Sequence, residues 1–279
     1  MATSPETPPA DRRLVLLTGA SGGIGRAIAR LLAHRGFNLV LVGRNKSALE
    51  GLRAELLGTG VEVLALAADL TDRDQRRNLP IRVVSRAGEI DVLVNNAGIT
   101  QVGAFAEIPP DDVRTVFEVN TIAPMLLTRS VLPKMLDRKT GHVVNISSLA
   151  GRVGLPWASV YAASKAALTE WTLALNTELG GTGVAATAIA PGLVSDEGMF
   201  ADLEVKAPAV QGTSKPEDVA NAVLQALAGT GGEIVVSSRP ARGLMAARAL
   251  APGLVESASR RLGLRDFLRG LAARRGGSD

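Results

Sequence analysis

Apolar and polar positions follow two alternating patterns along this chain, from about residue 13 to residue 238. Short apolar runs indicate buried strands, and the longer stretches between them repeat apolar residues at helical spacing. This order predicts an α/β fold in which helices cover both faces of a doubly wound, seven-stranded parallel sheet. The expected strands are 14–19, 38–43, 61–68, 91–96, 142–147, 184–190 and 233–238. One helix is expected between the first two strands, and further helices are expected at 46–58, 72–87, 111–137, 158–180 and 214–229.

The domain organisation follows from where this alternation begins and ends. No linker-like stretch interrupts it, so residues 12–240 are predicted to form a single domain. Residues 1–11 are Pro-rich and polar without an apolar core segment, and they are expected to be a disordered lead rather than a signal peptide. Residues 241–279 are expected to form a basic, helical C-terminal extension.

The composition excludes several classes of protein. Of 279 residues, 46% are apolar, enough to bury a sizeable core. The absence of cysteine excludes disulfides and thiolate metal sites, and two histidines, His34 and His142, offer little to a metal site or a Ser-His-Asp hydrolase, so no metal is predicted. Aromatic residues make up 3% and no basic stripe accompanies them, which argues against nucleic-acid binding. No uncharged run is suited to cross a membrane, and a cytoplasmic location is expected.

A glycine-rich turn, TGASGGIG, joins the first expected strand to the first expected helix. Gly19, Gly23 and Gly25 are its spaced glycines, and Ser21 and Ile24 lie between them. At such a turn the helix amides and the helix dipole point at an anion, and glycine lets a pyrophosphate approach the backbone. An ordinary strand-to-helix turn is the alternative. The amphipathic helix and second strand that follow favour a Rossmann-like dinucleotide site.

The end of the second expected strand bears on which dinucleotide is bound. An NAD site has an Asp or Glu there to bind the ribose 2′-hydroxyl, whereas this chain has Arg44. A guanidinium pairs with a 2′-phosphate, so NADP is predicted; an exposed loop arginine without this role is the alternative. After the third strand, Asp69 and Leu70 are candidates for the adenine edge, and Asp69 is equally suited to cap the next helix.

Tyr161 is the single tyrosine of the chain, and it lies four residues before Lys165, so both side chains share one face of a helix. A phenol with a pKa near ~10 is a poor proton donor at neutral pH, but a nearby ammonium group favours the phenolate and lowers that pKa. A surface pair is the commoner explanation of this spacing taken alone. The surrounding motifs favour an active site.

Six motifs together resemble the short-chain dehydrogenase/reductase family, over residues 13 to 238. They agree with that family in type, order and spacing. In chain order they are TGASGGIG at 18–25, NNAG at 95–98, Asn120 within FEVNTIAP, VVNISS at 143–148, YAASK at 161–165 and APG at 190–192. The resemblance implies a Rossmann-like fold and an NADP-dependent oxidoreductase that acts on a CH–OH or carbonyl group.

The same resemblance implies a role for individual residues. Ser148 would hold the substrate oxygen and Tyr161 would move the proton. Lys165 would bind the nicotinamide ribose and lower the tyrosine pKa, while Asn120 would support a water relay to Lys165. Ser147 is the rival of Ser148, but side-chain alternation along a strand would turn it away from the site. Further cofactor contacts are implied for Asn96, Ala97, Gly98, Pro191, Gly192 and Val194.

One departure from the family concerns the segment after the sixth strand. Asp196 stands where a threonine that holds the nicotinamide carboxamide is usual, and a carboxylate accepts hydrogen bonds but cannot donate them. Residues 197–213 are expected to form a lid over the substrate. Met199 and Phe200 from this lid, with Trp157, are expected to line the substrate pocket, which suggests an apolar substrate. The alternative is that they only pack the lid onto the core.

The leading hypothesis is an NADP-dependent carbonyl reductase or alcohol dehydrogenase for a hydrophobic small molecule. A 3-oxoacyl-thioester reductase is the nearest alternative; the ending EIVVSSRP, followed by 39 more residues, argues against it. A non-catalytic NADP-binding sensor is a third hypothesis, against which the complete motif set argues. The family resemblance suggests a homodimer or homotetramer built through the helices at 111–137 and 158–180.

The extension at 241–279 carries eight arginines and three acidic residues among regularly spaced apolar residues. Two helices broken near Pro252 and Gly253 are expected. They would cap the substrate cleft or a subunit interface. A less favoured alternative is weak peripheral contact with an anionic membrane surface.

Overall fold

The computed structural model describes residues 12–194 and 213–237, which fold around one sheet of seven parallel strands. The strands lie in the order β3-β2-β1-β4-β5-β6-β9, and every neighbouring pair is parallel. This confirms the predicted doubly wound α/β fold. The strands are β1 (Leu14–Thr18), β2 (Asn38–Gly43), β3 (Val63–Ala67), β4 (Val92–Asn95), β5 (Gly141–Ile146), β6 (Val184–Pro191) and β9 (Gly232–Val236).

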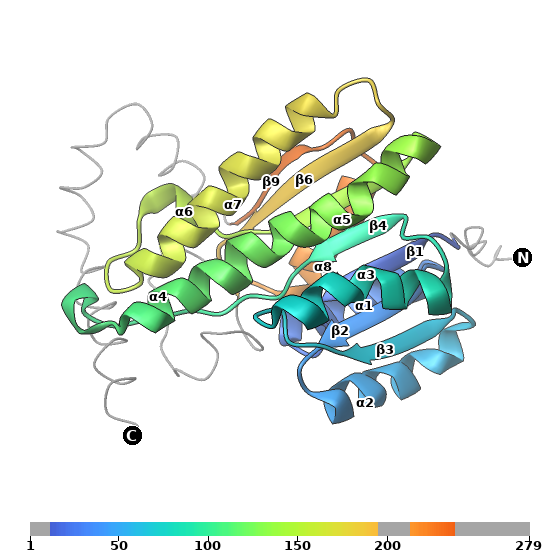
Figure 1. Cartoon of the computed structure of the whole chain (residues 1–279), viewed down its shortest axis with the longest axis horizontal. Coiled ribbons are helices and arrows are strands. Elements are labelled where there is room, and N and C mark those ends of the chain that lie inside the picture. The colour runs from blue at the N-terminus through green and yellow to red at the C-terminus, as the bar shows by residue number, and fades with distance from the viewer. Residues whose placement is uncertain (1–11, 195–212, 238–279) are drawn as a thin grey trace, which may run out of the picture.

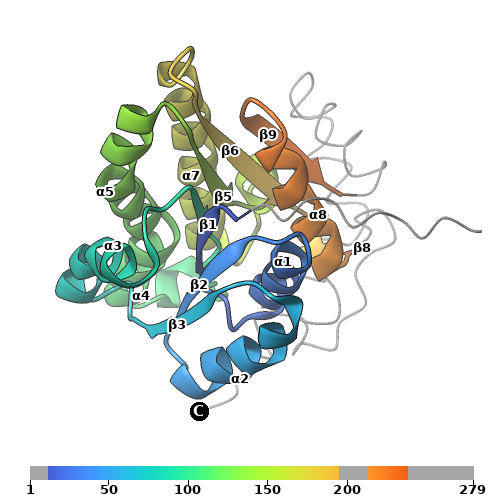
Figure 2. The ribbon, with the colours of Figure 1, turned by 90° about the vertical axis from the view of Figure 1, so that its right-hand side faces the viewer.

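Helices form a layer on each face of the sheet, as Figure 1 and Figure 2 show. α1, α2 and α8 cover one face, and α3, α5 and α7 cover the other. The helices are α1 (Gly23–His34), α2 (Lys46–Leu56), α3 (Arg73–Ala87), α4 (Pro110–Phe117), α5 (Ala123–Arg138), α6 (Ala150–Val153), α7 (Ser159–Glu178) and α8 (Pro216–Leu227). Short 3₁₀ turns occur at Leu57–Thr59 and Phe105–Glu107.

The strands are apolar throughout because both of their faces are buried. In β1, Val15 and Leu17 pack with α1, α2 and α8, whereas Leu14 and Leu16 pack with α3, α5 and α7. Successive side chains of a strand point to opposite faces, so a continuous apolar run is what a sheet covered on both sides requires. The apolar runs read from the sequence therefore predicted the layers as well as the strands.

The position of β1 determines where a ligand binds. β1 pairs with β2 on one side and with β4 on the other, so the chain reverses its direction of winding between them. In doubly wound sheets, ligands bind outside the carboxyl ends of the strands at this reversal. The turns that follow β1, β2, β4, β5 and β6 hold most of the candidate residues.

The expected helix at 111–137 is wrong as a single regular helix. α4 ends at Phe117, a π-helical turn occupies Glu118–Ile122, and α5 continues from Ala123. Apolar periodicity cannot detect a single wide turn, because the helix keeps its direction on either side of it. The structure also contains a two-residue parallel pairing, β7 (Leu193–Val194) with β8 (Thr213–Ser214), which the sequence did not predict.

Several expectations fall outside the described residues. These are the lead at 1–11, the extension at 241–279, and the lid with Asp196, Met199 and Phe200. Among the helices in the two described ranges, none has the length and apolar content needed to span a membrane.

His142 is a buried histidine whose pKa depends on the fold. It lies at the start of β5 with 5% of its surface exposed, and its Nε2 is 2.8 Å from Thr187 Oγ1 on β6. Burial, with the nearby positive charge of Arg13, lowers the pKa of His142 to about 4. In the unfolded chain His142 is protonated below pH ~6.5, whereas in the folded chain it is protonated only below about pH 4.

We expect the free energy of unfolding to fall as the pH drops from about 6.5 towards 4, with His142 responsible for roughly 2–3 kcal/mol of the loss. Urea unfolding of wild type and His142→Gln across this range measures it. The difference between the two proteins cancels the carboxylates that titrate in both. Parallel pH curves would contradict the assignment.

Candidate active site

The glycine-rich turn after β1 is closely packed where a pyrophosphate would lie. Gly19 has φ +64°, and a Cβ there would come within 2.7 Å of Ala97 Cα. A Cβ on Gly25 would collide with the Gly19 carbonyl oxygen. Gly22 caps α1 without a side-chain hydrogen bond, which leaves the first amides of the helix, at Gly23 and Ile24, available to an anion.

The turn after β4 is joined to this glycine-rich turn by hydrogen bonds. Thr18 Oγ1 accepts from the backbone amides of Asn96, at 3.0 Å, and Ala97, at 3.1 Å. In return, Asn96 Nδ2 donates to the carbonyl oxygens of Thr18 and Gly19. The turns after the two strands at the reversal are thus held together. Thr18 was not among the expected residues, and its signal is its place at the head of TGASGGIG.

Arg44 follows β2 and lies beside the glycine-rich turn. A Cβ on the preceding residue, Gly43, would lie 3.2 Å from Ser21 Oγ, so the two turns touch. The following residue, Asn45, is engaged as the cap of α2, accepting from the Ala48 amide at 3.0 Å. Arg44 is exposed, and within the described residues its side chain makes no hydrogen bond or ion pair. Its guanidinium is therefore available to an anionic ligand beside Ser21.

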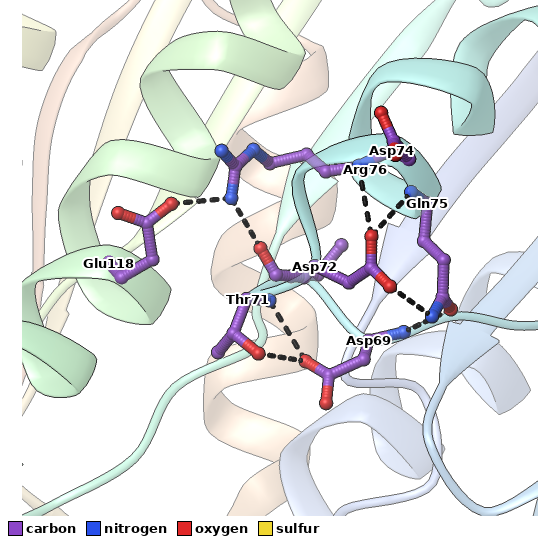
Figure 3. Close-up of polar contacts among 8 residues, drawn as sticks. Asp69, Thr71, Asp72, Asp74, Gln75, Arg76 and Glu118 are labelled. Carbon is purple, nitrogen blue, oxygen red and sulfur yellow. Dashed lines mark hydrogen bonds and ion pairs between the residues drawn. The ribbon is translucent and has the colours of Figure 1, made fainter.

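The turn after β3 decides between the two interpretations of Asp69. Its Oδ1 accepts from the amide and the hydroxyl of Thr71, at 2.9 and 2.8 Å, as Figure 3 shows. The cap of α3 is Asp72, which accepts from the amides of Asp74 and Gln75. The cap alternative for Asp69 is thus wrong, because the helix begins three residues later than that alternative requires. Leu70 beside it is buried.

Ser148, Tyr161 and Lys165 come together above the carboxyl end of β5. Tyr161 and Lys165 lie one turn apart on α7, with 4% and 3% of their surface exposed. Lys165 Nζ lies 6.0 Å from the centroid of the Tyr161 ring. Ser148 is the second residue after the end of β5, and its side chain hydrogen-bonds the Tyr161 hydroxyl. The rival serine, Ser147, is instead turned beneath α7.

The contacts of Ser147 explain why it faces away. Its hydroxyl donates to the Lys165 carbonyl oxygen at 2.9 Å and lies 2.6 Å from Thr169 Oγ1. Both contacts are buried and belong to α7. Ser147 therefore ties the helix to β5 while its neighbour Ser148 stays beside Tyr161, as the alternation of side chains predicted.

Asn120 lies in the π-helical turn and reaches the same place from another direction. A Cβ on Gly98 would lie 3.3 Å from Asn120 Oδ1 and 3.4 Å from Lys165 Nζ, so both groups border this glycine. Asn120 Oδ1 accepts from the amide of Ile99 at 2.8 Å, and its Nδ2 donates to Ser164 Oγ at 3.0 Å. Ser164 was not expected to contribute. Its signal is its position between Tyr161 and Lys165 in YAASK.

Burial controls the proton affinities in this group. Burial raises the pKa of Tyr161, and the hydrogen bond with Ser148 opposes that rise. Burial also lowers the pKa of Lys165 to about 8, although Nζ donates to the Ile146 carbonyl oxygen at 2.8 Å. The hydrogen bond with Ser148 thus works against burial in setting the proton affinity of Tyr161.

The remaining predicted residues lie around this group. Pro191 ends β6, and its carbonyl oxygen accepts from Leu149, next to Ser148. The amide of Gly192 donates to Val236, and Val194 pairs with β8. These contacts place the APG segment at the edge of the site.

The loop before α7 contains Trp157, and two apolar side chains pack near Tyr161. Trp157 has φ +59°, unusual for a residue with a side chain, and its carbonyl oxygen accepts from Gly103 at 2.8 Å. This bond links the loops after β4 and β5. Val102 and Leu155, which were not expected, pack against the apolar cluster that includes Tyr161.

Comparisons with known proteins agree with this geometry. The short chain dehydrogenase family model matches residues 13–206. The chain belongs to the short-chain dehydrogenase/reductase family. It is therefore an oxidoreductase, as predicted.

Two curated relatives match most of this family member's length. Ketoacyl reductase HetN of Nostoc sp. is 40% identical over 260 residues, which are 91% of this chain and 91% of that protein. Dehydrogenase/reductase SDR family member 7B of Bos taurus is 36% identical over 259 residues, covering 86% of this chain and 78% of that protein.

Solved structures agree in fold with TM-scores near three quarters. A variant of actinorhodin polyketide ketoreductase with NADPH has a TM-score of 0.76 and 32% identity, covering 83% of this chain and 98% of that one. A short-chain dehydrogenase from Sphingobium yanoikuyae in complex with NADPH has a TM-score of 0.75 and 31% identity, covering 88% and 95%.

The pKa of Lys165 leads to a prediction for activity. The lysine is charged below pH about 8 and neutral above it, whereas burial keeps Tyr161 protonated to higher pH. In the reducing direction we expect kcat/KM for NADPH to be level below about pH 8 and to decline above it, because kcat/KM reports the ionisation of the free enzyme.

Initial rates from pH 6 to pH 10 with one ketone measure this profile. Lys165→Arg keeps a permanent charge and should be less active but lack the decline. A wild-type profile that stays level through pH ~10 would exclude Lys165 as the titrating group.

Proposed function

We propose that this short-chain dehydrogenase transfers hydride between NADP(H) and a carbonyl or secondary alcohol of a hydrophobic small molecule. The cofactor is NADP(H), as in the solved relatives named above. The observation that carries the proposal is the buried contact of Ser148 with Tyr161, one helical turn from Lys165, beside the glycine-rich turn.

The turns after the strands fit a dinucleotide. Gly19 and Gly25, where a side chain would collide with backbone, and Gly23 at the start of α1 would let the pyrophosphate approach the amides of α1. Arg44 would pair with the 2′-phosphate, and Asp69 would meet the adenine. Ser21 and Ile24 in the first turn, Leu70 beside Asp69, the NNAG turn at 96–98 and the APG segment with Val194 complete the proposed contacts.

Bound NADPH supplies the hydride, and the residues of this chain hold and move the proton. Ser148 and Tyr161 would donate hydrogen bonds to the carbonyl oxygen, and Tyr161 would transfer its proton as charge develops there. Lys165, charged below pH about 8, favours the phenolate that remains. Asn120, bordering Gly98 with Lys165, would support the return of a proton through water.

The apolar lining supports a hydrophobic substrate. Val102 and Leu155 pack against the apolar cluster that includes Tyr161, and neither can donate or accept a hydrogen bond through its side chain. Trp157 belongs to the same loop as Leu155 and is proposed to extend this lining. A polar substrate body would lose its hydration there without compensation.

A 3-oxoacyl-thioester reductase is the second candidate. Ketoacyl reductase HetN matches 91% of this chain and 91% of its own length, so the two proteins are of comparable length. The 39 residues after EIVVSSRP therefore no longer argue against a ketoacyl reductase. The polyketide ketoreductase among the solved relatives favours the same class. A β-ketoacyl thioester would present its carbonyl to Ser148 and Tyr161 in the same way.

Assembly and location extend the proposal. We propose a homodimer or homotetramer through α4, α5 and α7, where Ile122, at the end of the π-helical turn, and Leu126, on α5, are exposed apolar residues. A cytoplasmic location stays a prediction.

Removing the hydroxyl of Tyr161 tests the proposed chemistry. Tyr161→Phe keeps the ring in its buried place but removes the proton, so kcat should fall by on the order of 10² to 10⁴. Ketone and 3-oxoacyl-thioester substrates, assayed by NADPH absorbance, separate the two candidates. NADPH binding by fluorescence should persist in the variant; near-normal turnover would exclude Tyr161 as the donor.

Arg44→Ala tests the proposed cofactor contact. Losing a charge-assisted bond to phosphate is worth roughly 1.5–3 kcal/mol, so the Kd for NADPH should rise by about 10- to 100-fold while that for NADH hardly changes. Arg35→Ala, an exposed arginine at the far end of α1, is the matched control. If wild type binds NADH and NADPH equally well, the 2′-phosphate has no partner at Arg44.

A further inference from the structure

Arg76 is a buried cation to which none of the roles above applies. It lies in the first turns of α3, and only 6% of its surface is exposed. Burying a guanidinium is costly unless its donors are satisfied and its charge is paired. The hydrogen-bond and ion-pair partners of Arg76 therefore identify the segments that its side chain holds together.

Both partners of the Arg76 side chain lie outside its own helix, and Figure 3 shows its contact with Glu118. Its Nη1 donates to the Leu70 carbonyl oxygen at 2.6 Å and to Glu118 Oε1 at 2.5 Å. Leu70 belongs to the turn after β3, whereas Glu118 begins the π-helical turn between α4 and α5. One nitrogen atom thus joins two segments that are 48 residues apart in the chain.

Each segment carries a residue of the proposed active site. Leu70 and the adjoining Asp69 form the proposed adenine edge, and Asn120 follows Glu118 by two residues in the same turn. Hydrogen bonds also join the turn after β3, which carries the proposed adenine edge, to the start of α3. The Asp69 amide donates to Gln75 Oε1 at 3.0 Å, and Gln75 Nε2 donates to the Asp72 carboxylate at 2.8 Å.

The π-helical turn is held on its other side by α7. Thr121 Oγ1 donates to the Ser164 carbonyl oxygen at 2.9 Å, and Asn120 donates to the Ser164 hydroxyl. Glu118, by contrast, is held from the adenine side by Arg76. Packing alone would be served as well by an apolar side chain, because replacing a buried ion pair with apolar residues of similar volume is often neutral or stabilising. What the guanidinium adds is a defined distance between the two segments.

We propose that Arg76 is a positioning residue that couples the adenine-binding turn to Asn120. Through Leu70 and Glu118 it holds the two segments in one geometry, so that NADPH affinity and proton transfer depend on the same side chain. This inference rests on the proposed roles of Asp69, Leu70 and Asn120.

Arg76→Met in the full chain is the primary test. Methionine fills much of the space, and Glu118, whose side chain is 28% exposed, can be hydrated once its partner is gone. We expect the Kd for NADPH to rise about 3- to 10-fold and kcat at saturating NADPH to fall roughly 10-fold, since small displacements of positioned groups have effects of this size. Arg77→Met, an exposed neighbour on α3, is the matched control and should match wild type in both.

A double-mutant cycle with Asn120→Ala separates coupling from a loss of stability. If Arg76 acts through Asn120, adding Arg76→Met to Asn120→Ala should lower kcat by less than about 2-fold, while the Kd for NADPH still rises. Arg76→Lys, which keeps a cation with several donors, should restore part of kcat. If Arg76→Met does not fold, Arg76→Lys and Glu118→Gln enter the same cycle.

Three results would overturn the inference. One is an equal fall in kcat in both backgrounds; another is a lower Tm with unchanged kcat and Kd. The third is a normal kcat in Asn120→Ala, which would remove the residue through which Arg76 is proposed to act. A failure of the proposed function gives a different result. If Tyr161 is not the proton donor, Tyr161→Phe retains its turnover with either Arg76 or Met at position 76.

Discussion

The burial of the Lys165 ammonium group is the constraint on which the rest of the site depends. With 3% of its surface exposed, Lys165 cannot be hydrated and must find its partners inside the protein. The Ile146 carbonyl oxygen provides one of them at 2.8 Å. Gly98, which has no side chain, leaves the approach to Nζ and to Asn120 open. Burial lowers the lysine pKa to about 8, a value suited to the proposed catalytic role of Lys165.

The geometry around this lysine is held by polar contacts along α7 rather than by loops. Ser147 and Thr169 join the helix to β5, and Ser164 and Thr121 join it to the π-helical turn. Each of these hydroxyl groups is buried and has a partner, so breaking one would leave a buried polar atom unsatisfied. A helix fixed on two sides therefore carries the Tyr161 phenol, which is the arrangement that the proposed proton transfer requires.

In the glycine-rich turn after β1, by contrast, close contacts between backbone segments fix the geometry. Gly19 and Gly25 bring the turn after β1 against its neighbours, and Thr18 links that turn to the one after β4. The charged groups lie at the periphery, with Arg44 exposed next to Gly43, which approaches Ser21, and Arg76 buried against the turn after β3. Backbone amides at the centre and cations at the margin suit a ligand with several phosphates.

Much of this architecture was determined by the sequence alone. The apolar runs predicted all seven strands of the sheet, because a strand buried on both faces needs continuous apolar residues, and the motif spacing predicted that Ser148, Tyr161 and Lys165 meet. Only the tertiary structure decided the wide turn at Asn120, the cap at Asp72 in place of Asp69, and the partners of Ser164 and Arg76. Periodicity reports how deeply a residue is buried, but not which distant group will satisfy its hydrogen bonds. That choice is made between segments 40 or more residues apart, as Arg76 with Glu118 and Asn120 with Ser164 show, and it depends on the packing of the completed fold.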